Sequence, residues 1–174
     1  MIFIYILATI LVIIIILAAV APKTYTVQRS ITINKPLSEV FTYLRSVKNQ
    51  DHWSPWKKKD PNMKQEFTGN DGTVGFVSRW EGNKDVGIGE QEIVMITENE
   101  RIDTELRFYK PWRSISQGFL TTEDSGDSQT KVTWGFAGNN KFPFSIMMLF
   151  FNMDKTVGKD FEEGLDSLKE ILEK

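Results

Sequence analysis

The chain has 174 residues, a formal net charge of −2, and hydrophobic and charged shares of 41% and 25%, which suit a single globular domain. Its 21 basic and 23 acidic residues are spread along the sequence, so we expect no nucleic-acid partner. The absence of cysteine excludes disulfides, thiolate nucleophiles and cysteine-ligated zinc. One histidine, His52, cannot form a multi-histidine metal site, and no calcium-loop spacing of acids occurs, so we expect no cofactor.

The first 21 residues carry no charged side chain and consist mainly of Ile, Leu, Val and Ala. As a helix they would span roughly 30 Å, the thickness of a bilayer core, which predicts a transmembrane anchor at 1–21. A cleaved secretory signal is the alternative, because Ala19-Val20-Ala21 has the small-x-small pattern. The missing basic n-region and the following Pro22 favour the uncleaved anchor.

Basic residues follow this segment and none precedes it: Lys23, Arg29 and Lys35 lie shortly after residue 21. The positive-inside tendency therefore favours a single-pass protein with a cytoplasmic domain at 22–174. A domain that faces the periplasm or the exterior remains the alternative.

The first predicted strand of this domain is Thr24–Ile33, in which apolar residues alternate with polar ones apart from Arg29. A short amphipathic helix is predicted after Pro36, and a brief helix or turn at 49–53. Six alternating segments bounded by Gly, Asn and Asp then predict an antiparallel meander. They are Lys64–Phe67, Thr73–Trp80, Val86–Thr97, Arg101–Tyr109, Ser114–Thr122 and Thr130–Ala137.

The clearest of these strands is Arg101–Tyr109, where charged residues alternate with Ile102, Thr104, Leu106 and Phe108. One face of the sheet is therefore expected to be exposed to solvent and the other to be buried. The glycines in Val86–Gly89 predict strong curvature or a bulge, which leaves the orientation of the residues beyond Glu90 open.

Helical spacing begins after Pro143 and predicts a long core-facing helix that runs to the end of the chain. Its first turns are apolar nearly all round. This pattern allows either packing under a neighbouring loop or a lip at a cavity mouth or beside a membrane.

Together, these elements resemble the SRPBCC or START-like helix-grip superfamily over Tyr25–Lys174, and in particular a bacterial, membrane-anchored, polyketide cyclase/dehydrase-like subgroup. The resemblance is carried by Arg29–Asn34, Trp53–Trp56, Thr130–Trp134 and Met153–Leu165. It implies an α+β fold in which a curved antiparallel sheet of about seven strands surrounds a long C-terminal helix. Because proteins of one fold host unrelated functions, the resemblance names no ligand.

Aromatic and apolar residues are expected to meet between the sheet and the helix and to line an apolar cavity. The candidate ligand-binding residues are Phe76, Trp80, Thr104, Leu106, Phe108, Phe119, Trp134, Phe136, Met147, Phe151 and Phe161. The alternative is that these side chains simply fill a solid core.

The expected function is to bind or carry an apolar or amphipathic small molecule, such as a lipid or a polyketide-like compound, at a membrane. A cyclase, dehydratase or hydrolase that uses the same cavity is one alternative, and a protein-interaction module is another. No catalytic constellation is recognisable. His52 is interpreted as a loop residue, and Arg29 as one member of a structural ion pair or a residue near the sheet edge.

Overall fold

The computed structural model describes residues 1–139, 142–150 and 152–174. Within them, seven strands form one antiparallel sheet in the order β1-β7-β6-β5-β4-β3-β2. The strands are β1 (Thr24–Ile33), β2 (Lys64–Thr68), β3 (Val77–Glu81), β4 (Ile88–Thr97), β5 (Arg101–Lys110), β6 (Ser114–Asp124) and β7 (Thr130–Asn139). The helices are α1 (Ile2–Val20), α2 (Leu37–Arg45), α3 (Gln50–Trp53), α4 (Pro55–Lys59), α5 (Phe144–Met147) and α6 (Met153–Leu172), with a 3₁₀ turn at Val47–Asn49.

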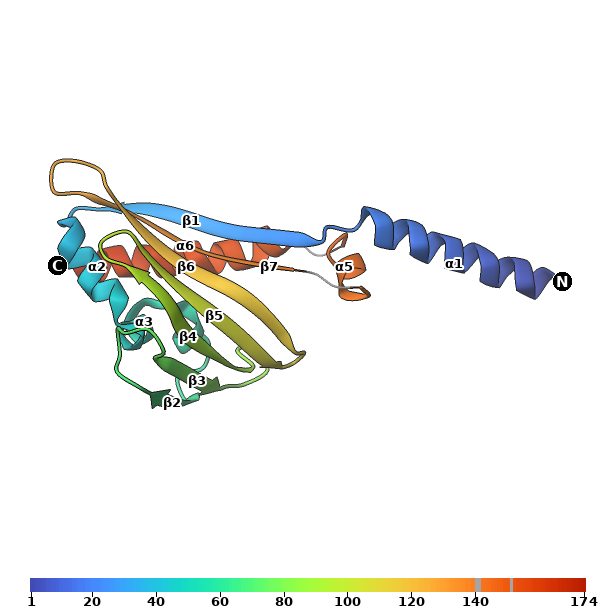
Figure 1. The fold of residues 1–174 in the computed structure, drawn as a ribbon, viewed down its shortest axis with the longest axis horizontal. Helices are drawn as coiled ribbons and strands as arrows, with labels where there is room; N and C mark the ends of the chain where they lie inside the picture. Colours follow the sequence, from blue (N-terminus) through green and yellow to red (C-terminus); the bar gives the residue numbers. More distant parts are fainter. Residues whose placement is uncertain (140–141, 151) are drawn as a thin grey trace.

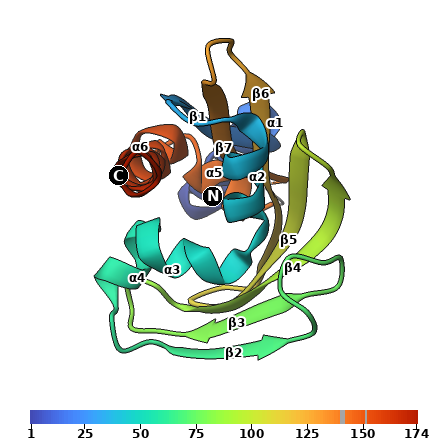
Figure 2. The ribbon, with the colours of Figure 1, turned by 90° about the vertical axis from the view of Figure 1, so that its left-hand side faces the viewer.

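The sheet curves around the short helices α2, α3 and α4, and the long helix α6 lies along β1 on the same side (Figure 2). Helix α1 projects from one end of the domain, next to the start of β1 and to α5 (Figure 1). These features confirm the predicted α+β helix-grip fold, including the long C-terminal helix and the apolar N-terminal helix.

The curvature has a local cause in β4. Its pairing with β5 shifts register between Ile88 and Gly89 and again between Ile93 and Met95, and such bulges bend a strand. A Cβ at Gly89 would lie 2.6 Å from the ring of Trp80 and 2.7 Å from the carbonyl oxygen of Arg107. Glycine is therefore required where β3 and β5 both approach β4, and the register shift at Ile88/Gly89 is the bulge that the Val86–Gly89 pattern predicted.

Two strands begin later than predicted, because a glycine adopts the left-handed conformation before each one. Strand β3 begins at Val77 rather than Thr73, after Gly75 with φ +86°, and β4 begins at Ile88 rather than Val86, after Gly87 with φ +76°. In both places the chain turns where the alternating pattern alone predicted an extended strand.

The C-terminal helix is also shorter than predicted. Its continuous part, α6, begins at Met153, and only the one-turn helix α5 lies between Pro143 and that point among the described residues. The Oδ1 of Asn152 accepts a hydrogen bond from the backbone N–H of Lys155 at 2.9 Å, which is a typical N-cap contact. Apolar residues continue at helical spacing through residues 144–153, so the sequence pattern did not show that the long helix begins at Met153.

The core lies between α6 and the inner face of the sheet. Helix α6 buries its apolar stripe, α2 buries one face, and the sheet contributes inward residues from β1, β4, β5, β6 and β7. The largest fully buried members are Trp53, Phe41, Phe76, Ile33, Leu44, Ile93, Ile102, Leu165 and Leu168. This packing occupies one end of the space under the sheet and leaves the other end open.

Candidate ligand cavity

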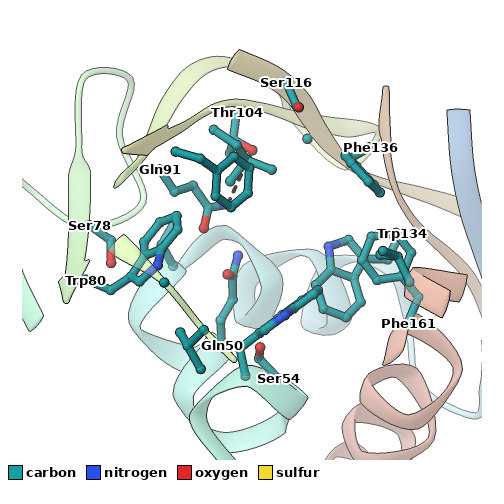
Figure 3. A pocket seen from close by; sticks show the side chains of 18 of the residues that line it. Gln50, Ser54, Ser78, Trp80, Gln91, Thr104, Ser116, Trp134, Phe136 and Phe161 are labelled. Atoms are coloured by element: carbon teal, nitrogen blue, oxygen red, sulfur yellow. Dashed lines mark hydrogen bonds between the residues drawn. The ribbon is translucent and has the colours of Figure 1, made fainter. Parts of the chain in front are cut away.

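A cavity of about 390 Å³ lies under the curved sheet, between the inner faces of β3 to β7 and the helices α3, α4 and α6. Figure 3 shows side chains from the sheet, from α3 and from α6 directed toward the same space. The volume is within the usual range of small-molecule pockets, which are mostly apolar with a few placed polar groups.

Seven of the predicted binding residues belong to the cavity wall with side chains on the inner face of the sheet or on α6. They are Trp80, Thr104, Leu106, Phe108, Trp134, Phe136 and Phe161. Their inward orientation follows from register, since Trp134 pairs with Leu120 on β6 and Phe108 pairs with Gly89 on β4.

Two other predicted residues, Phe76 and Met147, do not line the cavity. Phe76 is 0% exposed and stacks on Phe67 at 6.0 Å between ring centroids, so it fills core beside the cavity rather than lining it. Met147 is 49% exposed on α5 and does not belong to the cavity wall. Phe151 lies outside the described residues.

Phe119 is predicted on the inner face, and the register corrects this. It pairs with Asp103 and Gly135, whose side-chain positions are on the outer face, and the Arg101 guanidinium lies 4.7 Å from its ring centroid. Phe119 still borders the cavity, and we infer that its backbone atoms make this contact. In residues 114–122, apolar and small residues occur at both odd-numbered and even-numbered positions. Alternation alone therefore could not show which side chains of this strand face the cavity.

An aromatic cluster packs between the sheet and the helices, and its members Trp56, Trp134 and Phe161 line the cavity. Trp134 stacks on Phe161 of α6 at 4.3 Å and meets Trp53 and Trp56 edge to face at 4.7 and 5.4 Å. Gly164 on α6 allows this approach, because a Cβ there would lie 2.7 Å from the ring of Trp134. The α6 side of the cavity is therefore closely packed.

Polar groups line the cavity in small, mutually bonded sets. The hydroxyls of Tyr25 and Ser116 are 2.8 Å apart, and Gln91 Nε2 donates to Thr104 Oγ1 at 3.3 Å. Deeper toward the helices, Gln65 accepts from Lys57 Nζ and donates to Asp51 Oδ1, both at 2.8 Å.

Of these polar residues, sequence reasoning assigned only Thr104 to the site. The alternation along β1 was clear enough to predict that the side chain of Tyr25 faces inward. Gln91 follows the bulge in β4, so the face of the sheet that it occupies could not be predicted. The helices that carry Asp51 and Lys57 are too short to show a periodic signal.

The mouth of the cavity is defined by its exposed wall residues. These come from the loop between β3 and β4 and from the turn between β5 and β6, and they are Lys84, Asp85, Lys110, Pro111, Trp112 and Ser114. At the other end the wall consists of Leu44, Val47, Ile102 and Leu120, all of them buried. The cavity thus opens at the end where β5 turns into β6.

Arg29 lies on the inner face of β1, outside the cavity wall, and α6 provides its partners. Its Nη1 is 2.8 Å from Asp154 Oδ1 and its Nε is 2.6 Å from Glu162 Oε1. The hydrogen bond from Arg29 lowers the pKa of Asp154 below its usual value. Arg29 therefore forms a structural ion pair on the edge strand, as the sequence interpretation favoured.

His52 is exposed and does not belong to the cavity wall. It lies on the short helix α3, and its Nδ1 is 3.2 Å from the hydroxyl of Tyr43. Among the described residues, no three His, Cys, Asp or Glu side chains are grouped so that they could hold a metal ion.

A curved seven-stranded sheet, a long C-terminal helix and a partly apolar cavity between them define a helix-grip protein. In sequence, residues 24–173 match the family described as polyketide cyclase / dehydrase and lipid transport, and the chain belongs to that family. No curated protein matches the chain.

Solved structures share this fold at low sequence identity. A point mutant of norcoclaurine synthase from Thalictrum flavum, in complex with a transition-state analogue, has a TM-score of 0.63 at 10% identity, with 86% of this chain and 94% of that chain covered. A protein from Chromobacterium violaceum has a TM-score of 0.60 at 11% identity, covering 86% and 97%. Ara h 8.0201 has a TM-score of 0.56 at 15% identity, covering 86% and 95%. These similarities establish the fold alone.

Proposed function

We propose that the protein binds an apolar or amphipathic small molecule, lipid-like or polyketide-like, in the cavity and holds or carries it at a membrane. The observation that supports this most is the cavity of about 390 Å³, whose wall combines aromatic rings with a few polar groups. Such a wall removes an apolar body from water and orients one or two polar substituents. The family's description, which includes lipid transport, agrees with this use.

The membrane part of the proposal is supported by α1. Helix α1 is 19 residues long, is apolar enough to cross a bilayer and has no buried residue, features that a signal sequence shares. We propose that residues 1–21 remain as an anchor and that residues 22–174 form the binding domain. The basic residues Lys23, Arg29 and Lys35 after the helix favour a cytoplasmic domain.

The direct test has two parts. Native mass spectrometry of the purified full-length protein identifies any molecule that stays bound, and titration with an apolar fluorescent probe measures saturable binding. A Ser78→Phe variant places a ring on the inner face of β3, at a wall position that is 7% exposed, whereas Arg79→Phe places the same ring on the outer face one residue away. We expect Ser78→Phe to weaken probe binding by about tenfold or more and Arg79→Phe to leave it unchanged.

Two outcomes would contradict the proposal. Equal loss of binding in both variants, each with a wild-type denaturation curve, means that the probe does not bind on the inner face of the sheet. Absence of saturable binding in the wild-type protein means that the cavity does not act as a ligand site.

Enzymatic use of the same cavity is the second candidate, and one observation favours it. Asp51 and Lys57 both belong to the wall and are connected through Gln65, so an acid and a base lie within reach of a bound molecule. Mass analysis of a co-purified molecule after incubation with wild-type and Lys57→Met protein separates the two functions. Conversion by the wild type that is lost in the variant establishes an enzyme, and an unchanged molecule in both supports a carrier.

A further inference from the structure

The open end of the cavity and the end of α1 lie on the same side of the domain. Figure 1 shows α1, α5 and the turn between β5 and β6 at one end of the molecule, and the hairpin between β6 and β7 at the opposite end. The cavity opens at this β5–β6 turn. Only residues 21–23 separate α1 from β1, and three extended residues reach roughly 10 Å. A bilayer crossed by α1 therefore lies close to the mouth.

Large apolar side chains are exposed at this end. Trp112 in the β5–β6 turn is 57% exposed and Ile115 at the start of β6 is 62% exposed. Phe142 and Phe150, which flank α5, are 63% and 81% exposed. Tryptophan and other large apolar residues in such a position are typical of surfaces that enter the interface of a bilayer. We call these four residues the apolar rim.

Exposed basic residues accompany the apolar rim. Lys23 lies in the linker after α1 and Lys84 in the loop between β3 and β4. Lys110 is the last residue of β5, and Arg113 lies in the β5–β6 turn. The acidic residues Glu81 and Asp85 offset part of this charge. The remaining excess of positive charge complements anionic phospholipid headgroups, which attract basic residues close to a membrane surface.

We propose that the cavity mouth faces the bilayer that α1 spans and that the apolar rim enters its headgroup region. A lipid-like ligand then passes between the bilayer and the cavity without exposing its apolar body to bulk water. This inference rests on the proposed function for the ligand and on α1 remaining as an anchor. It adds the direction in which the mouth faces, the residues that contact the membrane and the route of entry.

The absence of cysteine makes the position of the rim directly measurable, because one introduced thiol can be labelled without background. Ile115→Cys places an environment-sensitive fluorophore on the apolar rim. Ser125→Cys, in the hairpin between β6 and β7, places it at the opposite end of strand β6 and serves as the matched control. The full-length variants are reconstituted into vesicles of phosphatidylcholine and phosphatidylglycerol that contain nitroxide-labelled headgroups.

We expect the Ile115 label to emit at shorter wavelength and to be quenched by the nitroxide lipid several-fold more strongly than the Ser125 label. The Ser125 label is expected to be quenched mainly by an aqueous quencher. If both labels are equally open to the aqueous quencher, the mouth does not face the bilayer and the inference is wrong.

A second measurement tests the route of entry. The variant Ile115→Glu/Phe150→Glu adds two negative charges to rim residues that lie outside the cavity wall, and Ser125→Glu/Ser128→Glu adds them to the opposite hairpin. The probe is a fluorescent fatty acid, supplied either in the vesicles or in solution to protein in detergent micelles. We expect the rim variant to take up the probe from vesicles about tenfold more slowly than the wild type, with unchanged affinity for the probe supplied in solution. The hairpin variant is expected to match the wild type in both assays.

The two proposals fail in different ways. If the wild type does not bind the probe from either source, the proposed function is wrong, while the label positions still report on orientation. If the probe binds but the rim variant takes it up from vesicles at the wild-type rate, entry from the bilayer is wrong and the binding function stands.

Discussion

Gly158 of α6 lies directly over the guanidinium of Arg29, and a Cβ at this position would overlap Nη2 of that side chain. The glycine thus allows Arg29 to reach Asp154 and Glu162 from beneath the helix. Gly164, two turns further along, accommodates the ring of Trp134 and Cδ of Pro55 in the same way. The two glycines let α6 approach the sheet closely, but they face neighbours of different stiffness.

Alanine substitutions at these glycines are expected to have different costs. At Gly158 the obstructing group is the end of a flexible side chain whose ion-pair partners are more than half exposed, so moving that side chain costs little. Replacing a helical glycine recovers about 1 kcal/mol, so Gly158→Ala should change the free energy of unfolding by less than about 1 kcal/mol. Gly164→Ala presses on packed rings and should destabilise the domain by about 1–3 kcal/mol. Chemical denaturation of residues 22–174 measures both, and equal costs would contradict this assignment.

Acid sensitivity is expected from Asp154. Its pKa is lowered in the folded protein by the hydrogen bond from Arg29, so the unfolded state binds a proton at higher pH than the folded state does. The stabilisation is therefore fully present above the unfolded pKa of about 4 and is lost as the pH falls through the folded value. The difference in stability between wild type and Asp154→Asn should be constant from pH 7 to about 5 and should shrink below about pH 4. The control is the same comparison in an Arg29→Gln background, where the donor of this hydrogen bond is absent and the pH-dependent part of the Asp154→Asn difference should disappear.

Trp134 is packed on one side and borders the cavity on the other, since it stacks on Phe161 and is only 8% exposed. Trp134→Ala should cost about 3 kcal/mol of unfolding free energy, at the low end for this substitution, and should change the affinity for an apolar probe. Trp53 is 0% exposed and outside the cavity wall, so Trp53→Ala should cost about 5 kcal/mol. A larger cost at Trp134 than at Trp53, with no saturable probe binding, indicates a filled core rather than a cavity.

His52 is expected to be dispensable. Because the imidazole is exposed on α3, outside the cavity wall, His52→Gln should change stability by less than about 0.5 kcal/mol and leave probe binding unchanged. If a reaction is found, its rate should also persist in this variant. A loss of roughly a hundredfold would assign His52 as a general base and favour the enzyme.

The anchor is tested by extraction. Full-length protein should remain in the membrane pellet through high-salt and alkaline washing, since the burial of about twenty apolar residues greatly exceeds surface charge attraction. Residues 22–174 alone should be soluble and folded. Recovery of a soluble form that begins near Pro22 would instead establish cleavage, and aggregation of the fragment would contradict the domain boundary.

The fold was predictable because strand and helix periods were clear in most elements. In the sequence, charged residues alternate with Ile102, Thr104, Leu106 and Phe108 along residues 101–108, and residues 157–172 carry a helical stripe. Both patterns reflect burial on one side, and the structure shows the expected register and packing.

The composition of the cavity wall was less predictable, because it depends on tertiary approach. The orientation of Phe119 required the pairing of β6 with β5, and that of Gln91 required knowledge of a bulge. Asp51 and Lys57 reach the wall only because α3 and α4 lie beneath the curved sheet. None of these relationships produces a periodic pattern of apolar residues from which it could have been predicted.

The pairing of β1 with β7 has a consequence for how the chain reaches its native state. Thr24 pairs with Asn139 and Ile33 with Thr130, so the first strand to be synthesised joins the sheet only after the last strand is complete. Until then Val27 and Ile33 have no strand beside them, and α6, which lies over β1, has not yet been made. Contacts of such long sequence separation slow folding, because a large loop must close before any of them forms. During synthesis the unpaired edge of β1 is therefore exposed for a time. In that time β1 can pair with a second chain or bind a chaperone.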